Sequence, residues 1–337
     1  MRINVLFPFS CLAIAALLSG CSQGSLSSNS SVQSEASSST TNESTSIIES
    51  SSSETIISSS EESSSSIESS VPEGYGEFSV TRIKNGSEPV FDDATSSWHL
   101  YVTSSKAEYS LTGYFEGDIV IEDGNALVSG YKGATLDLSG LYLVGTIQYT
   151  LADKNVALVV EEGTTNYLCG KTTALVSENN VEISGAGSLI ISASTGHGID
   201  CDKVTLYGDT LITINNVTKD GIHAHNLLTL NDSSVPFSGT LSIINVGDQG
   251  IDCSDGDGSE ADPYSGSISI VNGAKITISN AVNMVKTDLS LSVEGSLVGQ
   301  GISGDAITTK NTGNCVVSVG ESATFTCNGT NILSTTL

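Results

Sequence analysis

Charged and imidazole side chains recur at two positions of a segment that is repeated along the second half of the chain. Each copy has a central aliphatic residue, and the residue after it is in turn Asp200, His223, Asp252, Lys286 and Thr308. Two residues further on, the chain carries Asp202, His225, Ser254, Asp288 and Lys310. Carboxylates and imidazoles bind metal ions and transfer protons. We therefore expect a ligand-binding face that includes Asp200, Asp202, His223, His225 and Asp288.

Three carboxylates in this region could form a metal site. Asp248 and Asp252 flank a Gly-Ile pair, and Asp220 precedes the same pair in the previous copy. Calcium binds six to eight oxygen atoms, and carboxylates from adjacent copies could supply several of them. The equally plain alternative is that these are turn residues, because Asp and Gly favour turns for backbone reasons alone. Asp255 and Asp257 begin a loop that could hold a second calcium ion or could be a solvated acidic loop.

The histidines and the lysine could bind a metal ion or act as a base, but each also has a simpler structural interpretation. His223 and His225 supply two ligands, whereas a transition-metal site needs three or four. A hydrogen-bonded polar stack is therefore favoured over such a site. Lys286 could act as a base only if its pKa were lowered by burial or a nearby cation. Beside Asp252 and Asp288, an ion-paired surface lysine is favoured.

The elements that position these side chains follow from the spacing of the aliphatic residues. These residues are 199, 222, 251, 285 and 307, whose differences are 23, 29, 34 and 22, and Leu175 lies 24 residues before Ile199. Short stretches with alternating apolar residues lie between them, and no segment has a convincing helical period. The pattern predicts an all-β chain, a right-handed parallel β-helix with about 23 residues per coil. The aliphatic residues then point inward and their charged neighbours outward.

The N-terminal part predicts export and a tether. Met1-Arg2 and the apolar run from Val5 to Leu18 form a secretory signal that is too short to span a bilayer. Leu18-Ser19-Gly20-Cys21 resembles the lipobox of bacterial lipoproteins, which implies a lipidated Cys21 and anchoring of a surface-exposed protein in the cell membrane through acyl chains. The alternative is an ordinary signal peptide with a chance cysteine. We predict a signal peptide over 1–21, a disordered Ser/Glu-rich linker over 22–76 and a monomeric β-helix domain over 77–337.

Composition narrows the range of partners. The formal net charge is −26, which argues against nucleic acid as a partner because phosphate binding needs a basic surface. Aromatic residues are scarce, and the one tryptophan, Trp98, lies outside the repeats. The sequence thus predicts that a glycan would be bound by hydrogen bonds and by calcium ions. Cys201 and Cys253 lie two coils apart, about 10 Å, which is too far for a disulfide, whereas a pairing of Cys315 with Cys327 stays open.

Several motifs resemble one known family. Glu162-Gly163-Thr164-Thr165-Asn166, Gly185-Ala186-Gly187-Ser188-Leu189 and Asp220-Gly221-Ile222-His223 are similar to motifs of the bacterial polysaccharide-lyase-like carbohydrate-binding β-helix family, from about Trp98 to Thr326. The resemblance implies a right-handed β-helix, bound calcium, and binding of cellulose or acidic pectic chains. The chain departs from the family at Gly196-His197, which has no aspartate.

The Asp-x-Gly-Ile-Asp arrangement at 248–252 also resembles the calcium site of β-helical pectate lyases. That resemblance implies a lysine base on a following coil, at the position of Lys286. The sequence therefore favours a surface lipoprotein that binds polysaccharide through a calcium-bearing β-helix. A calcium-dependent lyase and a structural or adhesive surface protein are the alternatives.

Overall fold

The computed structural model describes residues 71–103, 106–124, 133–151, 154–229 and 236–337, without the side chains of 226–229. The predicted signal peptide, Cys21 and most of the predicted linker lie outside these residues. Within the described ranges no helix is long and apolar enough to cross a membrane.

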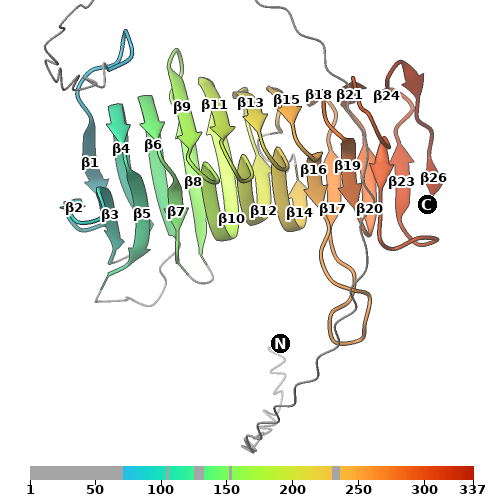
Figure 1. Ribbon diagram of the computed structural model, residues 1–337, viewed down its shortest axis with the longest axis horizontal. Helices are drawn as coiled ribbons and strands as arrows, with labels where there is room; N and C mark the ends of the chain where they lie inside the picture. The colour runs from blue at the N-terminus through green and yellow to red at the C-terminus, as the bar shows by residue number, and fades with distance from the viewer. Residues whose placement is uncertain (1–70, 104–105, 125–132, 152–153, 230–235) are drawn as a thin grey trace, which may run out of the picture. The chain divides into compact units, whose positions relative to one another are not determined.

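The described chain is a parallel β-solenoid of about eight turns with roughly 25 residues per turn (Figure 1). Three parallel sheets run along it, and each turn adds a strand or part of a strand to each sheet. The first sheet contains β3 (Ser97–Val102), β5 (Asp118–Asp123), β7 (Ile147–Tyr149), the start of β10 (Leu175–Gly185), the starts of β12 (Ile199–Leu206) and β14 (Ile222–Thr229), β16 (Gln249–Cys253), β19 (Asn283–Thr287) and β22 (Ile307–Thr308).

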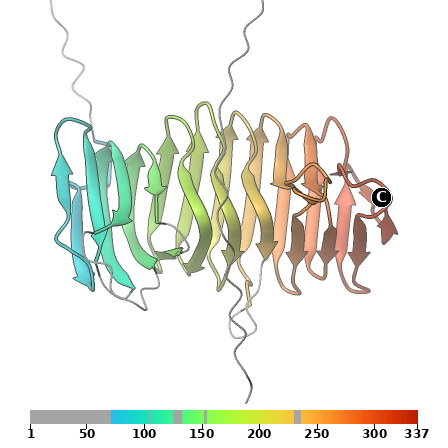
Figure 2. The same ribbon diagram turned by 90° about the horizontal axis from the view of Figure 1, so that it is seen from below.

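The other two sheets share the long strands at the N-terminal end. The second sheet contains the starts of β4 (Ala107–Glu116) and β6 (Gly133–Val144), then β8 (Asn155–Val160), the ends of β10, β12 and β14, and β17 (Ser267–Ile270), β20 (Ser290–Val293) and β23 (Val316–Val319). The third contains the ends of β4 and β6, then β9 (Thr165–Gly170), β11 (Ser188–Ala193), β13 (Leu211–Val217), β15 (Thr240–Val246), β18 (Lys275–Ser279), β21 (Ser296–Gln300) and β24 (Thr324–Cys327). Figure 2 shows the stacked coils from below.

The aliphatic residues of the repeat stack in the core, as their spacing predicts. Ile199 pairs with Ile222, Ile222 with Ile251, and Ile251 with Val285, and all four side chains are completely buried. Because side chains alternate along a strand, one inward residue per coil is enough to continue this apolar column. The predicted parallel β-helix is confirmed. The predicted coil of about 23 residues is slightly short, because some coils carry long loops, such as residues 254–265, which project between β16 and β17 (Figure 1).

Asparagine side chains form a short ladder where coils bend at the third sheet. Asn216, Asn245 and Asn280 have φ values of 55°, 55° and 57°, which asparagine tolerates better than most residues. The amide of Asn245 donates to Asn216 at 3.2 Å, and Asn280 donates to Asn245 at 2.9 Å. The ladder therefore stabilises the same turn on three successive coils.

Antiparallel strands close both ends of the solenoid. At the N-terminal end β1 (Ser79–Lys84) pairs with β4, and β2 (Val90–Asp92) pairs with β3. At the C-terminal end β25 (Thr330–Asn331) pairs with β24 and β26 (Thr335–Thr336) with β23, while Ile332 and Leu337 pack against the core. These pairings cover strand edges that would otherwise bind another chain.

None of the five cysteines among the described residues forms a disulfide. Cys201 and Cys253 are buried, in agreement with their prediction as small core residues. Cys315 and Cys327 do not form the disulfide that the sequence left open, and the thiol of Cys315 lies 3.5 Å from the carbonyl oxygen of Thr287.

Candidate functional site

A cluster of histidine and aspartate side chains lies on the first sheet, over β12, β14 and β16. Asp200 and His223 are outward residues of β12 and β14 at paired positions, while His197 and Asp220 lie in the turns that precede these strands. Asp252 occupies the next paired position, on β16. Residues separated by up to 55 positions in the chain thus lie together on this sheet.

Glycines in the turns allow the coils to approach closely here. A Cβ atom at Gly221 would lie 2.6 Å from Ile243 Cγ2 and 2.7 Å from the carbonyl oxygen of Gly250. Asp220 in turn accepts a hydrogen bond from the backbone N–H of Gln249 at 2.8 Å. The Asp-Gly-Ile motif therefore has a backbone role in stacking one coil on the next. One oxygen of Asp220, Oδ2, remains directed to the cluster, 3.1 Å from His197 Nδ1.

The two histidines of the cluster pack face to face. The rings of His197 and His223 have centroids 4.6 Å apart and are inclined by 18°. His223 Nδ1 is hydrogen-bonded to Asp200 Oδ1 at 3.0 Å, and His225 Nε2 lies 3.7 Å from the same oxygen. The side chain of His225 is half exposed, whereas that of His197 retains 13% of its accessible surface.

The hydrogen bond between Asp200 and His223 changes the acidity of both groups. Burial alone would raise the pKa of Asp200, but the hydrogen bond from His223 and the nearby histidines lower it. The pKa of His223 is raised by its hydrogen bond to Asp200, and burial only partly offsets this effect. The pair therefore favours a charged carboxylate beside an imidazole that is protonated more readily than a free histidine.

Asp252 and Lys286 form an ion pair at the edge of the cluster. Lys286 Nζ lies 2.8 Å from Asp252 Oδ2, and the hydroxyl of Ser254 donates to Asp252 Oδ1 at 2.6 Å. The side chains of Asp252 and Lys286 retain 7% and 23% of their accessible surface. The predicted ion pairing of Lys286 with Asp252 is confirmed, although Asp252 is buried and not displayed on the surface.

Asp288 does not lie on the expected ligand-binding face. Its side chain is completely buried, where one oxygen accepts hydrogen bonds from the backbone N–H of Lys310 at 2.7 Å and from the hydroxyl of Thr309 at 3.3 Å. The chain bends after β19, so the alternation of a straight strand no longer applies at this residue. Asp288 therefore stabilises the turn of the following coil.

The structure brings together only part of the predicted metal ligands. One oxygen or nitrogen each from Asp220, His223 and Asp252 lie within 4.8 Å of one another, and His197, Asp200 and His223 form a second such group. Each group is a candidate metal site. Asp248 is exposed and belongs to neither group.

The predicted loop site is also separate from the cluster. Asp255 and Asp257 are exposed residues of the projecting loop, and neither belongs to either metal-binding group. The carboxylate of Asp257 accepts a hydrogen bond from the backbone N–H of Ser259 at 2.8 Å, which lowers the pKa of Asp257.

Two further residues concern the expected ligand-binding face. Asp202 on β12 is only partly exposed. The site residues predicted from the sequence did not include His197, although it lies only two residues before the aligned Ile199 and is therefore next to the repeat.

A second feature that the sequence did not predict is a row of tyrosines on the third sheet. Tyr114, Tyr142 and Tyr167 occupy paired positions on β4, β6 and β9, and all three are partly exposed. The rings of Tyr142 and Tyr167 are stacked with centroids 4.9 Å apart, and Tyr114 lies 5.6 Å from Tyr142. Tyr75 packs edge-on against Tyr142 at 5.2 Å, although it was assigned to the linker.

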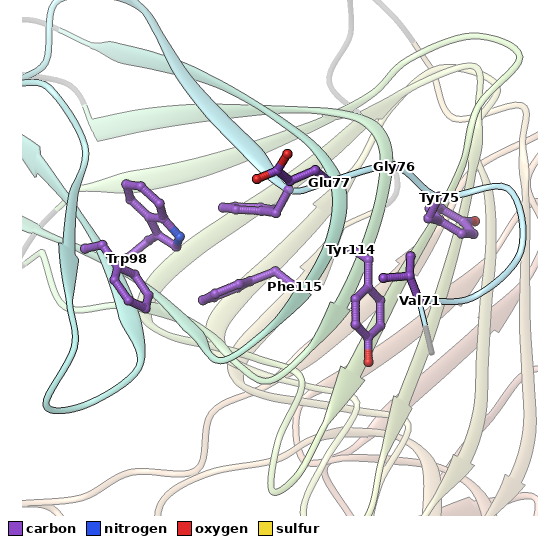
Figure 3. A pocket seen from close by; sticks show the side chains of 9 residues that line it. Val71, Tyr75, Gly76, Glu77, Trp98, Tyr114 and Phe115 are labelled. Atoms are coloured by element: carbon purple, nitrogen blue, oxygen red, sulfur yellow. The ribbon is translucent and has the colours of Figure 1, made fainter. Parts of the chain in front are cut away.

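The tyrosine row continues into an aromatic groove near the N-terminal end of the solenoid. The groove has a volume of about 520 Å³ and is lined by Val71, Tyr75, Gly76, Glu77, Phe78, Phe91, Trp98, Tyr114 and Phe115. Phe78 and Phe115 are stacked at 4.7 Å, and Phe91 lies 5.3 Å from Trp98. Figure 3 shows Trp98, Phe115 and Tyr114 around this space, with Glu77 at its margin. The volume lies within the range of small-molecule binding sites.

The tyrosine spacing was a signal that could have revealed this surface. Tyr114, Tyr142 and Tyr167 are separated by 28 and 25 residues, close to one coil each. The other groove residues come from the segment before the repeats, so periodicity alone could not connect them with the row.

The fold and these surfaces define a parallel β-solenoid with an exposed aromatic face and a histidine–aspartate cluster. Residues 99–324 match the family described as carbohydrate-binding domain-containing protein, and the chain belongs to this family. The matched range contains the whole cluster and all three tyrosines of the row, while Trp98 and the preceding groove residues lie before it. No curated protein and no solved structure matches the chain.

Proposed function

We propose that this protein binds a polysaccharide chain along the tyrosine row and the adjoining aromatic groove. The observation that carries the proposal is the alignment of Tyr114, Tyr142 and Tyr167 on successive coils, continuous with the groove at Tyr114. Partly exposed aromatic rings at paired positions form an extended platform. A glycan chain, which repeats along its length, is suited to such a platform.

The chemistry of aromatic rings supports this choice of ligand. One face of a pyranose ring presents C–H bonds with partial positive charge, and these pack against aromatic side chains. The stacked rings of Tyr142 and Tyr167 offer their outer edges to such a chain, and the exposed Phe91 in the groove offers a further contact. Adjacent coils are about 4.8 Å apart, so rings on successive coils can contact neighbouring parts of one chain. The hydroxyl groups of the sugar remain free to bond with Glu77 and with water at the margin of the groove.

Charge favours a neutral glycan over an acidic one. Among the described residues, Glu77 is the only charged one that lines the groove, and the chain carries a formal net charge of −26. A uronate chain would be repelled unless cations bridged the carboxylates. Of the two glycan classes that the sequence suggested, we therefore propose a neutral β-glucan such as cellulose, with acidic pectic chains as the weaker candidate.

The contacts of Lys286 do not favour a lyase. A base needs a free lone pair, whereas the Lys286 ammonium donates to the buried Asp252 carboxylate at 2.8 Å. Binding without bond cleavage is therefore the function that we propose. A purely structural or adhesive role does not explain why aromatic rings are aligned on successive coils.

A pull-down on insoluble glycans tests the proposal. The full chain is mixed with microcrystalline cellulose, xylan and calcium-crosslinked polygalacturonate, and the bound fraction is measured against protein concentration. An aromatic pair contributes about 0.5–1.5 kcal/mol. Taking the same value for a sugar on each tyrosine ring, we expect Tyr142→Ala/Tyr167→Ala to weaken cellulose binding roughly tenfold or more. Tyr142→Phe keeps the ring and should bind like the wild type, and Tyr207→Ala is the control outside the row. Unchanged binding by the double variant would exclude the platform.

We also propose that the chain is displayed at the cell surface as a monomer, held by acyl chains on Cys21 through the Ser/Glu-rich linker. The lipobox-like sequence before Cys21 and the composition of residues 22–70 support this proposal. Partitioning of the full chain into a detergent phase should be lost in Cys21→Ser. Equal partitioning of both proteins would contradict lipidation at this residue.

A further inference from the structure

The donor atoms of the histidine–aspartate cluster do not match the calcium site that the family resemblance implies. Calcium is coordinated by six to eight oxygen atoms. Each metal-binding group instead includes the imidazole of His223, and one of them also includes His197. Asp248, the further carboxylate expected to bind calcium, is in neither group. The cluster therefore offers nitrogen together with oxygen, and too few carboxylates for calcium.

We propose that this cluster binds a divalent transition-metal ion such as zinc. Imidazole and carboxylate are the common protein ligands of zinc, which takes four ligands, often three from the protein. His197, Asp200 and His223 form one possible set, and Asp220, His223 and Asp252 form the other. His223 is common to both sets. We assign it as the central ligand.

Only small side-chain movements are needed to close either set on an ion. Zinc–ligand bonds of about 2.0–2.2 Å place tetrahedral ligand atoms roughly 3.3 Å apart. The donor atoms of each set already lie within 4.8 Å of one another. Asp200, His223 and Asp252 are on strands held in register by backbone hydrogen bonds, while His197 and Asp220 lie in the turns that lead into these strands. Rotations about side-chain bonds can supply the remaining difference.

The contacts of His197 give an independent indication of a missing partner. Its Nδ1 is buried, and although this atom lies 3.1 Å from Asp220 Oδ2, the two groups are not oriented to form a hydrogen bond. A buried polar atom without a hydrogen bond is costly. A metal ion bound at Nδ1 would give this edge of the imidazole a partner. The stacked ring of His223 would be held in the same site.

The net negative charge of the cluster also favours a divalent cation. Asp200, Asp220 and Asp252 contribute three negative charges, and Lys286 contributes one positive charge, so the sum is −3 + 1 = −2 with neutral histidines. The side chains of Asp220 and Asp252 each retain only 7% of their accessible surface. Charges with so little solvent need compensation nearby. A divalent cation would balance them.

Titration calorimetry with the metal alone tests this proposal. The full chain, stripped with a chelator, is titrated with Zn²⁺ and separately with Ca²⁺. We expect zinc to bind at least 100-fold more tightly than calcium, and His223→Gln to weaken zinc binding at least 100-fold because both ligand sets lose a member. His225→Gln, on the same strand but outside both sets, should bind zinc like the wild type.

A second measurement separates a lost ligand from a lost fold. Cobalt(II) bound by nitrogen and oxygen ligands in a tetrahedral site absorbs visible light, and this band should appear with wild type and be absent in His223→Gln. Circular dichroism of the variant should retain the strand signal. Calcium binding as tight as zinc, or zinc binding that His223→Gln leaves unchanged, would overturn the proposal. Because cellulose retention is measured separately with chelator present, failure of the metal site leaves the proposed polysaccharide binding untouched.

Discussion

The ion pair between Asp252 and Lys286 allows a quantitative prediction. In Lys286→Met, the aliphatic stem is kept while the ammonium that faces Asp252 at 2.8 Å is removed. Breaking a buried ion pair by removing one partner typically costs about 3–5 kcal/mol, because a buried charge is left without compensation. Here the hydroxyl of Ser254 still donates to Asp252, and the lysine is 23% exposed. We therefore expect a smaller loss, about 2 kcal/mol.

The measurement is thermal unfolding followed by far-UV circular dichroism in a chelator, which removes any bound metal. For a folded unit of this size, Ile67–Leu337, about 2 kcal/mol corresponds to a Tm lower by roughly 4 °C. Lys275→Met is the matched control, because Lys275 is an exposed residue of β18, and its Tm should change by less than about 2 °C.

The double variant Asp252→Asn/Lys286→Met distinguishes an electrostatic cost from a packing cost. The amide introduced in place of the carboxylate would still accept the hydrogen bond of Ser254 but would carry no charge, so we expect the double variant to regain at least half of the lost Tm. A Tm of Lys286→Met within about 1 °C of wild type, or a double variant less stable than the single one, would refute the reasoning.

Two further predictions concern the core and the pH dependence of stability. Ile222→Ala removes a completely buried side chain from the middle of the aliphatic column. It should lower the free energy of unfolding by about 2–5 kcal/mol, as measured by guanidinium unfolding monitored by circular dichroism. A loss below about 1 kcal/mol would mean that this column does not hold adjacent coils together. The raised pKa of His223 means that in metal-free protein its pairing with Asp200 stabilises the fold fully below the unfolded histidine pKa of about 6.5, and that this contribution is lost as pH rises through the higher folded value. The free energy of unfolding of wild type and of His223→Gln, both with chelator present, is measured between about pH 5 and 9. The difference between the two proteins should shrink as the pH rises, and a difference that stays constant with pH would contradict the prediction.

The predictability of this fold rests on one local pattern. The inward residues Ile199, Ile222 and Ile251 could be aligned from the sequence, because alternation along a strand determines which side chains point inward. The same alignment correctly paired Asp200 with His223 and His223 with Asp252. It was wrong for Asp288, since the chain bends after β19 and alternation ends where the strand does.

The candidate sites were less predictable, because their residues come from turns and from outside the repeats. His197 precedes its strand, so no strand register could place it against the ring of His223. Tyr75, Phe78 and Trp98 come from the segment before the family match, and composition alone marked aromatic residues as scarce.

The sequence by itself determined the solenoid, its apolar column and the family to which the chain belongs. These depend on residues that repeat once per coil, and each coil packs on its neighbours in the same way. Only the tertiary structure decided where His197 and the aromatic side chains find their partners. The turn that brings His197 to His223 is not repeated in the other coils, and the N-terminal segment that brings Tyr75 to Tyr142 lies outside the repeats. Their positions follow from local backbone geometry and close packing, which a repeat pattern does not encode.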